Sequence, residues 1–265
     1  MNSKPCITAF RKTVWDYWKK NGRHELAWRK TKDPYHILVS EVMLQQTQVP
    51  RVTEKYKEFL KVFPTVQSLA KAPLNSVLKA WSGLGYNRRG KYLHDAAKII
   101  VSEYSGNIKK AIQNPLPGVG SYTRSAVRVF AFNEADILIE TNIRAAFIHY
   151  FFPRKKSVFD KDILLLIEKS AEAQDPRKWN WALMDYGAYI KKSHKNPGRK
   201  SAVYVRQSKF EGSLRQARGA ILRELYKDQP LLNQLSFEKE RMESALAALA
   251  RDGLITKQKG KWRIS

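Results

Sequence analysis

Apolar residues recur at three- and four-residue spacings along most of this 265-residue chain, and this pattern constrains the fold more than any other feature. Val52, Tyr56, Phe59 and Phe63 show the spacing clearly, and Pro64 ends it. Proline and glycine interrupt the pattern at short intervals, while the two-residue alternation typical of strands is scarce. The sequence therefore predicts an all-α globule of many short helices without a parallel sheet.

A break in composition after residue 190 divides the chain into three parts. Residues 1–190 are predicted to form one domain, residues 191–212 a basic linker or surface loop, and residues 213–265 a small module. In the first part we expect helices over residues 74–81, 91–104, 123–132, 141–151, 160–173 and 179–190. In the module, helices over 213–226 and 237–252 precede two short strands at 254–258 and 261–264. Helices followed by a basic hairpin resemble a winged helix that binds DNA; a protein-contact module is the alternative.

The charge of the chain indicates its partner. The sequence holds 49 Lys and Arg against 24 Asp and Glu, a formal charge of +25. An excess of this size on a folding chain favours nucleic acid over other partners. A membrane surface competes as an explanation, but no apolar run approaches the roughly 20 residues of a span. The first residues also lack a signal-peptide core, so we expect the protein in the cytoplasm or nucleoid. We also expect it to be a monomer.

The segment LPGVGSYT at residues 116–123 is a candidate phosphate site. Gly118 and Gly120 lie two apart at the start of a predicted helix, where backbone N–H groups can face outward without a Cβ in the way. Such a turn followed by a helix N-terminus suits a DNA phosphate. The candidate contacts are Gly118, Val119, Gly120, Ser121 and Thr123. A plain helix connector is the alternative, and a monovalent or divalent cation is another candidate occupant.

Three further segments accompany this hairpin: SEVMLQQTQV at 40–49, WSGLGY at 81–86 and ALMDYGA at 182–188. Together the four resemble the helix–hairpin–helix (HhH-GPD) DNA glycosylase superfamily, especially its MutY-type adenine DNA glycosylases, over residues 26–190. The resemblance implies a partner of double-stranded DNA with a damaged or mispaired base. It implies base excision repair: flipping of adenine opposite 8-oxoguanine or guanine, and hydrolysis of its N-glycosidic bond. A thymine or uracil mismatch glycosylase and a non-catalytic DNA-binding relative are the alternatives.

The resemblance also assigns the chemistry to two carboxylates. Glu41 would be the acid that protonates the departing base and later activates water; without the resemblance, an exposed helix glutamate would be the preferred interpretation. The family places an aspartate as the anionic stabiliser where this chain has Glu140, so the charge is kept and the reach grows by one methylene. Helix capping is the alternative role for Glu140, and Asp136 is a substitute candidate.

The remaining site residues follow from the same resemblance. Tyr122 stands where relatives with lyase activity carry a Schiff-base lysine, so we expect a monofunctional enzyme without efficient strand cleavage. Trp28 would border the base pocket together with Glu41. Further DNA contacts are expected at Gln45, Gln46, Thr47, Gly83, Gly85 and Tyr86. The polar residues at 45–47 could equally be the solvent face of their helix.

Two departures from the family are visible. Relatives bind an iron–sulfur cluster through four cysteines, but these 265 residues hold one, Cys6, so no such cluster is expected. The basic stretch 191–206 occupies the place of the cluster loop, and Lys191 and Lys195 are candidate phosphate contacts or a solvated charge run. The short tail after residue 208 also does not look like the larger domain with which relatives read 8-oxoguanine.

Overall fold

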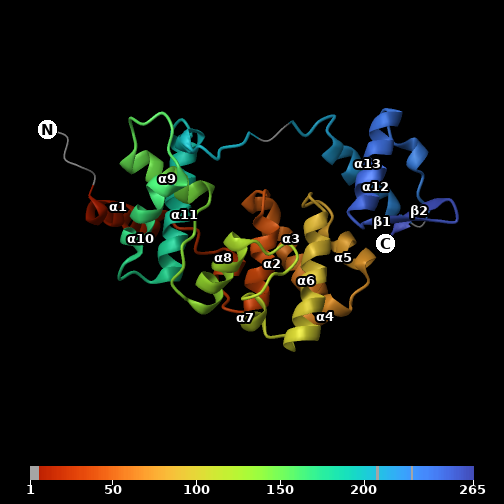
Figure 1. Cartoon of the computed structure of the whole chain (residues 1–265), viewed down its shortest axis with the longest axis horizontal. Helices are drawn as coiled ribbons and strands as arrows, with labels where there is room; N and C mark the ends of the chain where they lie inside the picture. The colour runs from red at the N-terminus through yellow and green to blue at the C-terminus, as the bar shows by residue number, and fades with distance from the viewer. Residues whose placement is uncertain (1–5, 207–208, 228) are drawn as a thin grey trace. The chain divides into compact units, whose positions relative to one another are not determined.

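The computed structural model describes residues 6–206, 209–227 and 229–265. Nearly all regular structure is helical, with one small β-hairpin near the C-terminus (Figure 1). The prediction of an all-α chain is confirmed. The chain forms two compact units, one of residues 6–37 and 121–206, the other of residues 38–120 and the described residues after 206. No helix in the described ranges is both long enough and apolar enough to cross a bilayer.

The first unit contains α1 Ile7–Asn21, η1 Ala27–Arg29, α8 Ser121–Phe132, α9 Thr141–Phe151, α10 Asp160–Ala171, α11 Pro176–Ser193 and η2 Pro197–Lys200. The second contains α3 Val49–Val62, α4 Val66–Lys71, α5 Leu74–Trp81, α6 Arg88–Tyr104, α7 Ile108–Ala111, α12 Leu214–Leu225, η3 Leu232–Gln234, α13 Lys239–Arg251, β1 Ile255–Gln258 and β2 Lys261–Ile264. Helix α2, Pro34–Leu44, crosses the division.

Most predicted helices lie where the spacing placed them, and the differences have local causes. Helices α5 and α9 have the predicted bounds, whereas α8 begins two residues early at Ser121 and α11 three residues early at Pro176. Proline is favoured in the first turn of a helix, which explains the earlier start of α11. Helix α4 was not predicted because six residues are too few to show a period; a capping box between Thr65 and Ser68 starts it.

In the first unit, α9 and α11 pack at very close range. A Cβ on Gly187 of α11 would lie 1.9 Å from the carbonyl oxygen of Asn142 in α9, so only glycine permits this approach. Phe10 of α1 packs beside these helices, with ring centroids 4.8 Å from Phe147 and 6.3 Å from Trp179. The glycine of the ALMDYGA segment therefore sets how closely the start of α9 is held.

The C-terminal module belongs to the second unit. Its strands pair antiparallel from Ile255↔Ile264 to Gln258↔Lys261, and left-handed residues at Lys259 and Gly260 form the turn. Gly253, at φ +65°, ends α13 in the left-handed conformation expected at that position. Helices and strands thus lie within two residues of their predicted bounds, while the winged-helix assignment stays a prediction.

Candidate active site and DNA interface

Glu41 lies on α2, a helix that is buried over most of its surface. Asp33 begins the helix by accepting hydrogen bonds from the backbone N–H groups of Tyr35 (2.8 Å) and His36 (3.2 Å). The Glu41 residue is only 7% exposed, and its neighbours Ser40 and Val42 are buried as well. Glu41 is therefore not a solvent-exposed helix glutamate. A carboxyl shielded from water interacts more strongly with a charge that develops beside it.

The polar segment after α2 contacts two other predicted DNA-binding segments of the same unit. The Thr47 hydroxyl donates to the carbonyl of Leu84 (3.2 Å), and the Gln45 amide donates to the carbonyl of Gly118 (3.4 Å). Gln46 is exposed and has a left-handed backbone, with φ +57°. The fold thus brings residues 45–47 next to the turn at 83–86 and next to the hairpin, although the three are far apart in sequence.

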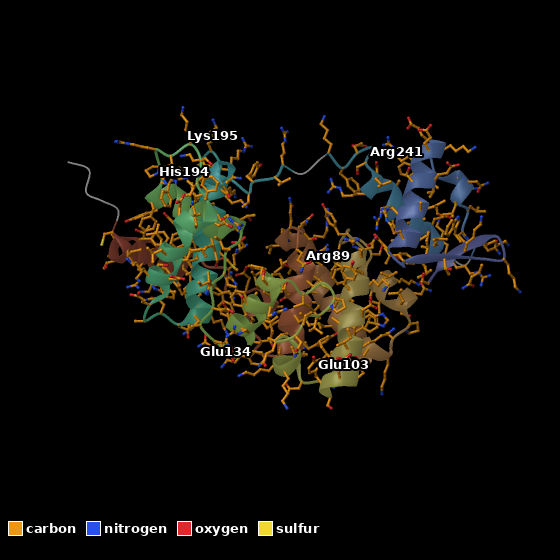
Figure 2. The ribbon with its side chains drawn as sticks, viewed as in Figure 1. Arg89, Glu103, Glu134, His194, Lys195 and Arg241 are labelled. Atoms are coloured by element: carbon orange, nitrogen blue, oxygen red, sulfur yellow. The ribbon has the colours of Figure 1, made fainter. Side chains whose placement is uncertain are left out.

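Arg89 on α6 (Figure 2) links the 45–47 segment to the turn at 83–86. Its Nη1 donates to the carbonyls of Val42 (2.8 Å) and Met43 (2.9 Å) at the end of α2. Its Nη2 donates to the Thr47 hydroxyl (2.9 Å) and to the carbonyl of Gly85 (3.0 Å). We call Arg89 and these acceptors the Arg89 cluster. One side chain therefore holds the end of α2, the polar segment and the glycine turn together.

Sequence reasoning missed Arg89. The pair Arg88–Arg89 has the composition of an exposed basic surface, and only the tertiary structure leaves the second arginine half-buried. Burial lowers the pKa of Arg89 to about 10, partly opposed by the nearby Tyr86. The guanidinium thus stays protonated at neutral pH, and its partners are neutral carbonyl and hydroxyl oxygens. The cluster therefore keeps a positive charge.

The two glycines of the hairpin before α8 differ in backbone conformation and in the space around them. Val119 N–H donates to the carbonyl of Leu116 (3.1 Å), which closes the turn. Gly118 has φ +70°, and a Cβ there would meet Tyr92 at 2.8 Å, so the fold itself requires this glycine. Gly120 is exposed with ordinary φ, and a Cβ there would have no described atom within 4 Å. Packing therefore does not explain the glycine at position 120.

The three site residues predicted in the first turn of α8 differ in their exposure to solvent. Ser121 is exposed, Tyr122 is half-buried, and Thr123 is 3% exposed. The Thr123 side chain is therefore directed into the protein rather than toward a bound molecule. Among the three side chains, Ser121 is the most exposed and Thr123 the least.

Glu140 caps α9. One carboxylate oxygen accepts from the backbone N–H groups of Asn142 and Ile143, both at 2.8 Å, and the other from the Thr141 hydroxyl at 3.2 Å. The capping role considered for Glu140 is thus observed, and the positive end of the helix stabilises its negative charge. Asp136 instead forms an ion pair with Arg128 at 3.0 Å.

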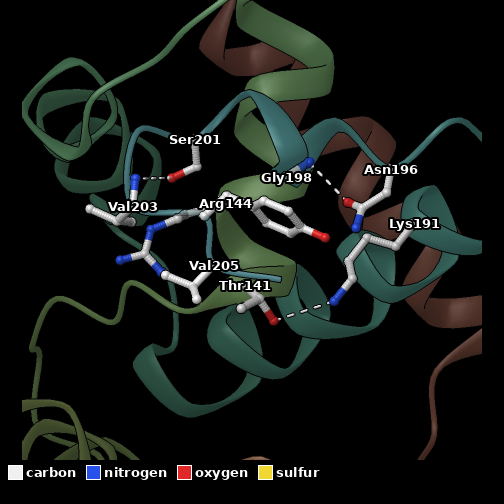
Figure 3. A pocket seen from close by; sticks show the side chains of 9 residues that line it. Thr141, Arg144, Lys191, Asn196, Gly198, Ser201, Val203 and Val205 are labelled. Atoms are coloured by element: carbon white, nitrogen blue, oxygen red, sulfur yellow. Dashed lines mark hydrogen bonds between the residues drawn. The ribbon is translucent and has the colours of Figure 1, made fainter. Parts of the chain in front are cut away.

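The basic stretch after α11 packs in part against α9. Lys191 donates to the Thr141 hydroxyl at 3.3 Å (Figure 3). It also donates to the Asn142 side chain at 3.1 Å, so this lysine supports the turn that Glu140 caps. Lys195 is exposed (Figure 2). A cavity of about 130 Å³ adjoins this turn and is lined by Thr141, Arg144, Lys191, Asn196, Gly198, Ser201, Val203, Tyr204 and Val205. Lys191 is therefore not part of a fully solvated charge run.

Trp28 and Asp185 lie in the interior of the first unit. Trp28 is 6% exposed within η1. Asp185 of the ALMDYGA segment accepts from Arg29 (2.7 and 2.9 Å) and Arg23 (2.7 Å), and its side chain is 1% exposed. We call these three charged residues the Asp185 cluster. Burial on its own raises the pKa of Asp185, but the hydrogen bonds and charges of the two arginines outweigh it and lower the pKa below its ordinary value.

Metal binding finds no support in the part of the chain that the structure describes: no group of three or more His, Cys, Asp or Glu side chains there could hold an ion. The cation considered at the hairpin would instead depend on backbone carbonyls, and it stays a prediction.

Comparisons with known proteins find one family model and several relatives that resemble this chain. The model of the HhH-GPD superfamily base excision DNA repair protein matches residues 39–169. Adenine DNA glycosylase of Buchnera aphidicola subsp. Baizongia pistaciae (strain Bp) is 36% identical over 187 residues, which are 68% of this chain and 52% of that protein. Adenine DNA glycosylase of Homo sapiens is 31% identical over 198 residues, 69% of this chain and 36% of that protein. The chain spans about half the length of the curated relatives it matches first.

Solved structures are similar to this chain over more of their length. A thermostable thymine-DNA glycosylase has a TM-score of 0.59 and 27% identity, covering 69% of this chain and 86% of that one. A trapped endonuclease III–DNA covalent intermediate has a TM-score of 0.55 at 18% identity, covering 74% of this chain and 89% of that one; this likeness concerns the fold alone.

Proposed function

Since residues 39–169 belong to the HhH-GPD superfamily of base excision DNA repair proteins, we propose that this protein is a monofunctional DNA N-glycosylase that removes adenine mispaired with 8-oxoguanine or guanine. Identities of 31–40% to adenine DNA glycosylases support this substrate. The charge of +25 supports double-stranded DNA as the partner. The protein would act as a monomer, inside the cell, where its DNA substrate lies.

The proposed chemistry needs an acid and an anion. Breaking the bond between the base and C1′ passes through a sugar with oxocarbenium character. Glu41 would protonate the departing base and then activate the attacking water, and its burial supports this role because water does not screen it. Glu140 would stabilise the positive sugar. Its cap hydrogen bonds with the start of α9 support this role because they fix the orientation of the carboxylate.

The DNA would be held by backbone groups and by cations. The exposed, unobstructed Gly120 supports a phosphate at the hairpin, with Ser121 beside it. The 45–47 segment would fill the gap left by the flipped base. Tyr122 cannot form the imine of a lyase, so we expect an intact abasic site as product.

The observation that carries this proposal is the burial of Glu41 one helical turn before a polar segment that contacts the hairpin through Gln45. The test uses duplexes with adenine opposite 8-oxoguanine or guanine, followed by alkali treatment. We expect strand breaks after alkali and few before it. No base loss from these duplexes or from T:G, U:G and hypoxanthine duplexes would exclude a glycosylase.

A second candidate is a thymine or uracil mismatch glycosylase. The observation that favours it is coverage of the relative's length. The structural match spans 86% of a thermostable thymine-DNA glycosylase, whereas the sequence match spans 52% of the Buchnera adenine DNA glycosylase. The same duplex panel decides between the two: excision from T:G or U:G without excision of adenine would replace the first proposal.

The substitution Glu41→Gln separates an enzyme from a non-catalytic DNA-binding relative. An enzyme should lose excision and keep its affinity for DNA, whereas a protein that only binds should behave as before. Affinity should also fall with salt, with a log–log slope of about −0.9 for each phosphate neutralised. A salt-insensitive affinity would contradict the phosphate contacts at the hairpin.

A further inference from the structure

The C-terminal module shares an apolar core with α5. Leu78 of α5 is fully buried in one cluster with Ile221, Leu222 and Leu249 of the module. The hydroxyl of Tyr226 in the module donates to the carbonyl of Leu78 at 3.0 Å. Because apolar burial and a satisfied polar group act at the same contact, the module is fixed to α5 rather than tethered beside it.

A buried carboxylate fixes the module to the start of α6 as well. Asp252, after α13, accepts hydrogen bonds from Arg218 of α12 and from Arg88 of α6, the latter at 3.1 Å. Its side chain is only 7% exposed, so water screens these ion pairs weakly. The module therefore contacts α6 two residues after Tyr86.

Tyr86 itself lies between Arg215 of the C-terminal module and Arg89 of α6. Arg215 of α12 donates to the Tyr86 hydroxyl at 2.7 Å, and its guanidinium lies 5.5 Å from the ring centroid. Arg89 of α6 lies 5.5 Å from the same centroid. Tyr86 has φ +47°, a left-handed conformation that is unfavourable for an aromatic residue and persists only when its surroundings hold it. The two guanidiniums provide that support.

We propose that Arg215 is a positioning residue: from the C-terminal module it holds Tyr86, and through Tyr86 and Arg89 it holds the 83–86 turn and the 45–47 segment in the conformation that engages DNA. The contacts form a continuous chain, because Arg89 also donates to the Thr47 hydroxyl at 2.9 Å and to the carbonyl of Gln45. Glu41 lies one helical turn before Gln45. This inference rests on the proposed function, since the 45–47 segment and Tyr86 are assigned to DNA there.

The test compares Arg215→Ala with Arg223→Ala. Arg223 lies on the same helix, is exposed and carries the same charge, so it is the matched control. We expect Arg215→Ala to lower the single-turnover excision rate at saturating enzyme about tenfold, since small displacements of reacting groups have large effects on rate. Arg223→Ala should stay within about twofold of the wild-type rate. Arg215→Lys, which keeps the charge without the planar fork, should recover part of the rate.

A second variant, Tyr86→Phe, and a measurement of hydrogen exchange test the proposal independently. Tyr86→Phe removes the hydroxyl that Arg215 binds, so it should lower the rate as well, and the double variant should be no slower than the slower single variant. Amide hydrogen exchange over residues 82–89 should be faster in Arg215→Ala than in Arg223→Ala. If the wild-type protein excises no base, the proposed function fails, and the exchange comparison still decides whether Arg215 orders the turn. Equal rates and equal exchange in Arg215→Ala and Arg223→Ala would overturn the proposal whatever the activity.

Discussion

The Asp185 cluster holds a buried charge and the Arg89 cluster a half-buried one, and the two charges are compensated differently. Asp185 is met by two arginines at 2.6–2.9 Å, so opposite charges lie side by side. Arg89 is met by carbonyl and hydroxyl oxygens of residues 42–47 and 85, so its positive charge is solvated but not cancelled. The first arrangement stabilises a fold, whereas the second also leaves a positive charge beside the segments assigned to DNA.

The largest expected effect is on stability, in the Asp185 cluster. Asp185→Asn removes the negative charge and leaves Arg29, whose side chain is 5% exposed, without its counter-ion. Losing one partner of a buried pair costs about 3–5 kcal/mol, so the free energy of unfolding in urea should fall by about that amount. A loss below about 1 kcal/mol would show that the pair contributes little and would weaken the contrast between the clusters.

Arg89→Met should affect stability less and excision more. The change removes the charge at similar length and leaves several carbonyl oxygens without their donor, at a cost of about 2–3 kcal/mol in the free energy of unfolding. The single-turnover excision rate should fall by at least about tenfold, because the 45–47 segment loses its support. Measured on fully folded protein, Asp185→Asn should lower this rate less than Arg89→Met; the reverse order would contradict the assignment of functions to the two clusters.

The pH dependence of the unfolding free energy tests whether Asp185 is ionised in its cluster. The pKa of Asp185 is lowered in the folded protein, so its pairing contributes stability above the unfolded-state pKa of about 3.9, and this contribution is lost as the pH falls through the folded-state pKa. The difference in unfolding free energy between wild type and Asp185→Asn should therefore be constant from pH 7 to about 5 and shrink below about 4. Chemical denaturation at several pH values measures it, and a pH-independent difference would mean that Asp185 is not ionised in this cluster.

The smallest structural effect is expected at the hairpin, where the two glycines act as each other's control. Gly120→Ala meets no described atom within 4 Å, so the melting temperature should hardly change, while DNA affinity falls several-fold because the methyl group obstructs the phosphate. Gly118→Ala should lower stability as well, because of its φ of +70° and its contact with Tyr92. Unchanged DNA binding in Gly120→Ala would make the hairpin a plain helix connector.

Local patterns predicted much of the fold. The bounds of α5 and α9 and the positions of the two strands follow from spacing and turn chemistry, which neighbouring residues decide. The candidate carboxylates were reached through motif resemblance, and burial of Glu41 added what its residue type could not show. Arg89 could not be found in this way, since an arginine after another arginine has the pattern of an exposed surface until tertiary contacts bury it.

The amino-acid sequence by itself determined the helical architecture, the strongly basic charge and the shortage of cysteines, because these depend on residue type and on neighbours along the chain. Only the tertiary structure decided that α5 and the C-terminal module share a core, that Arg89 joins residues 42–47 to residues 84–85, and that Arg215 binds Tyr86. These contacts join residues that are 42 to about 150 positions apart. Contacts at that separation leave no periodic trace in a sequence, because either partner alone looks like any other arginine, tyrosine or leucine.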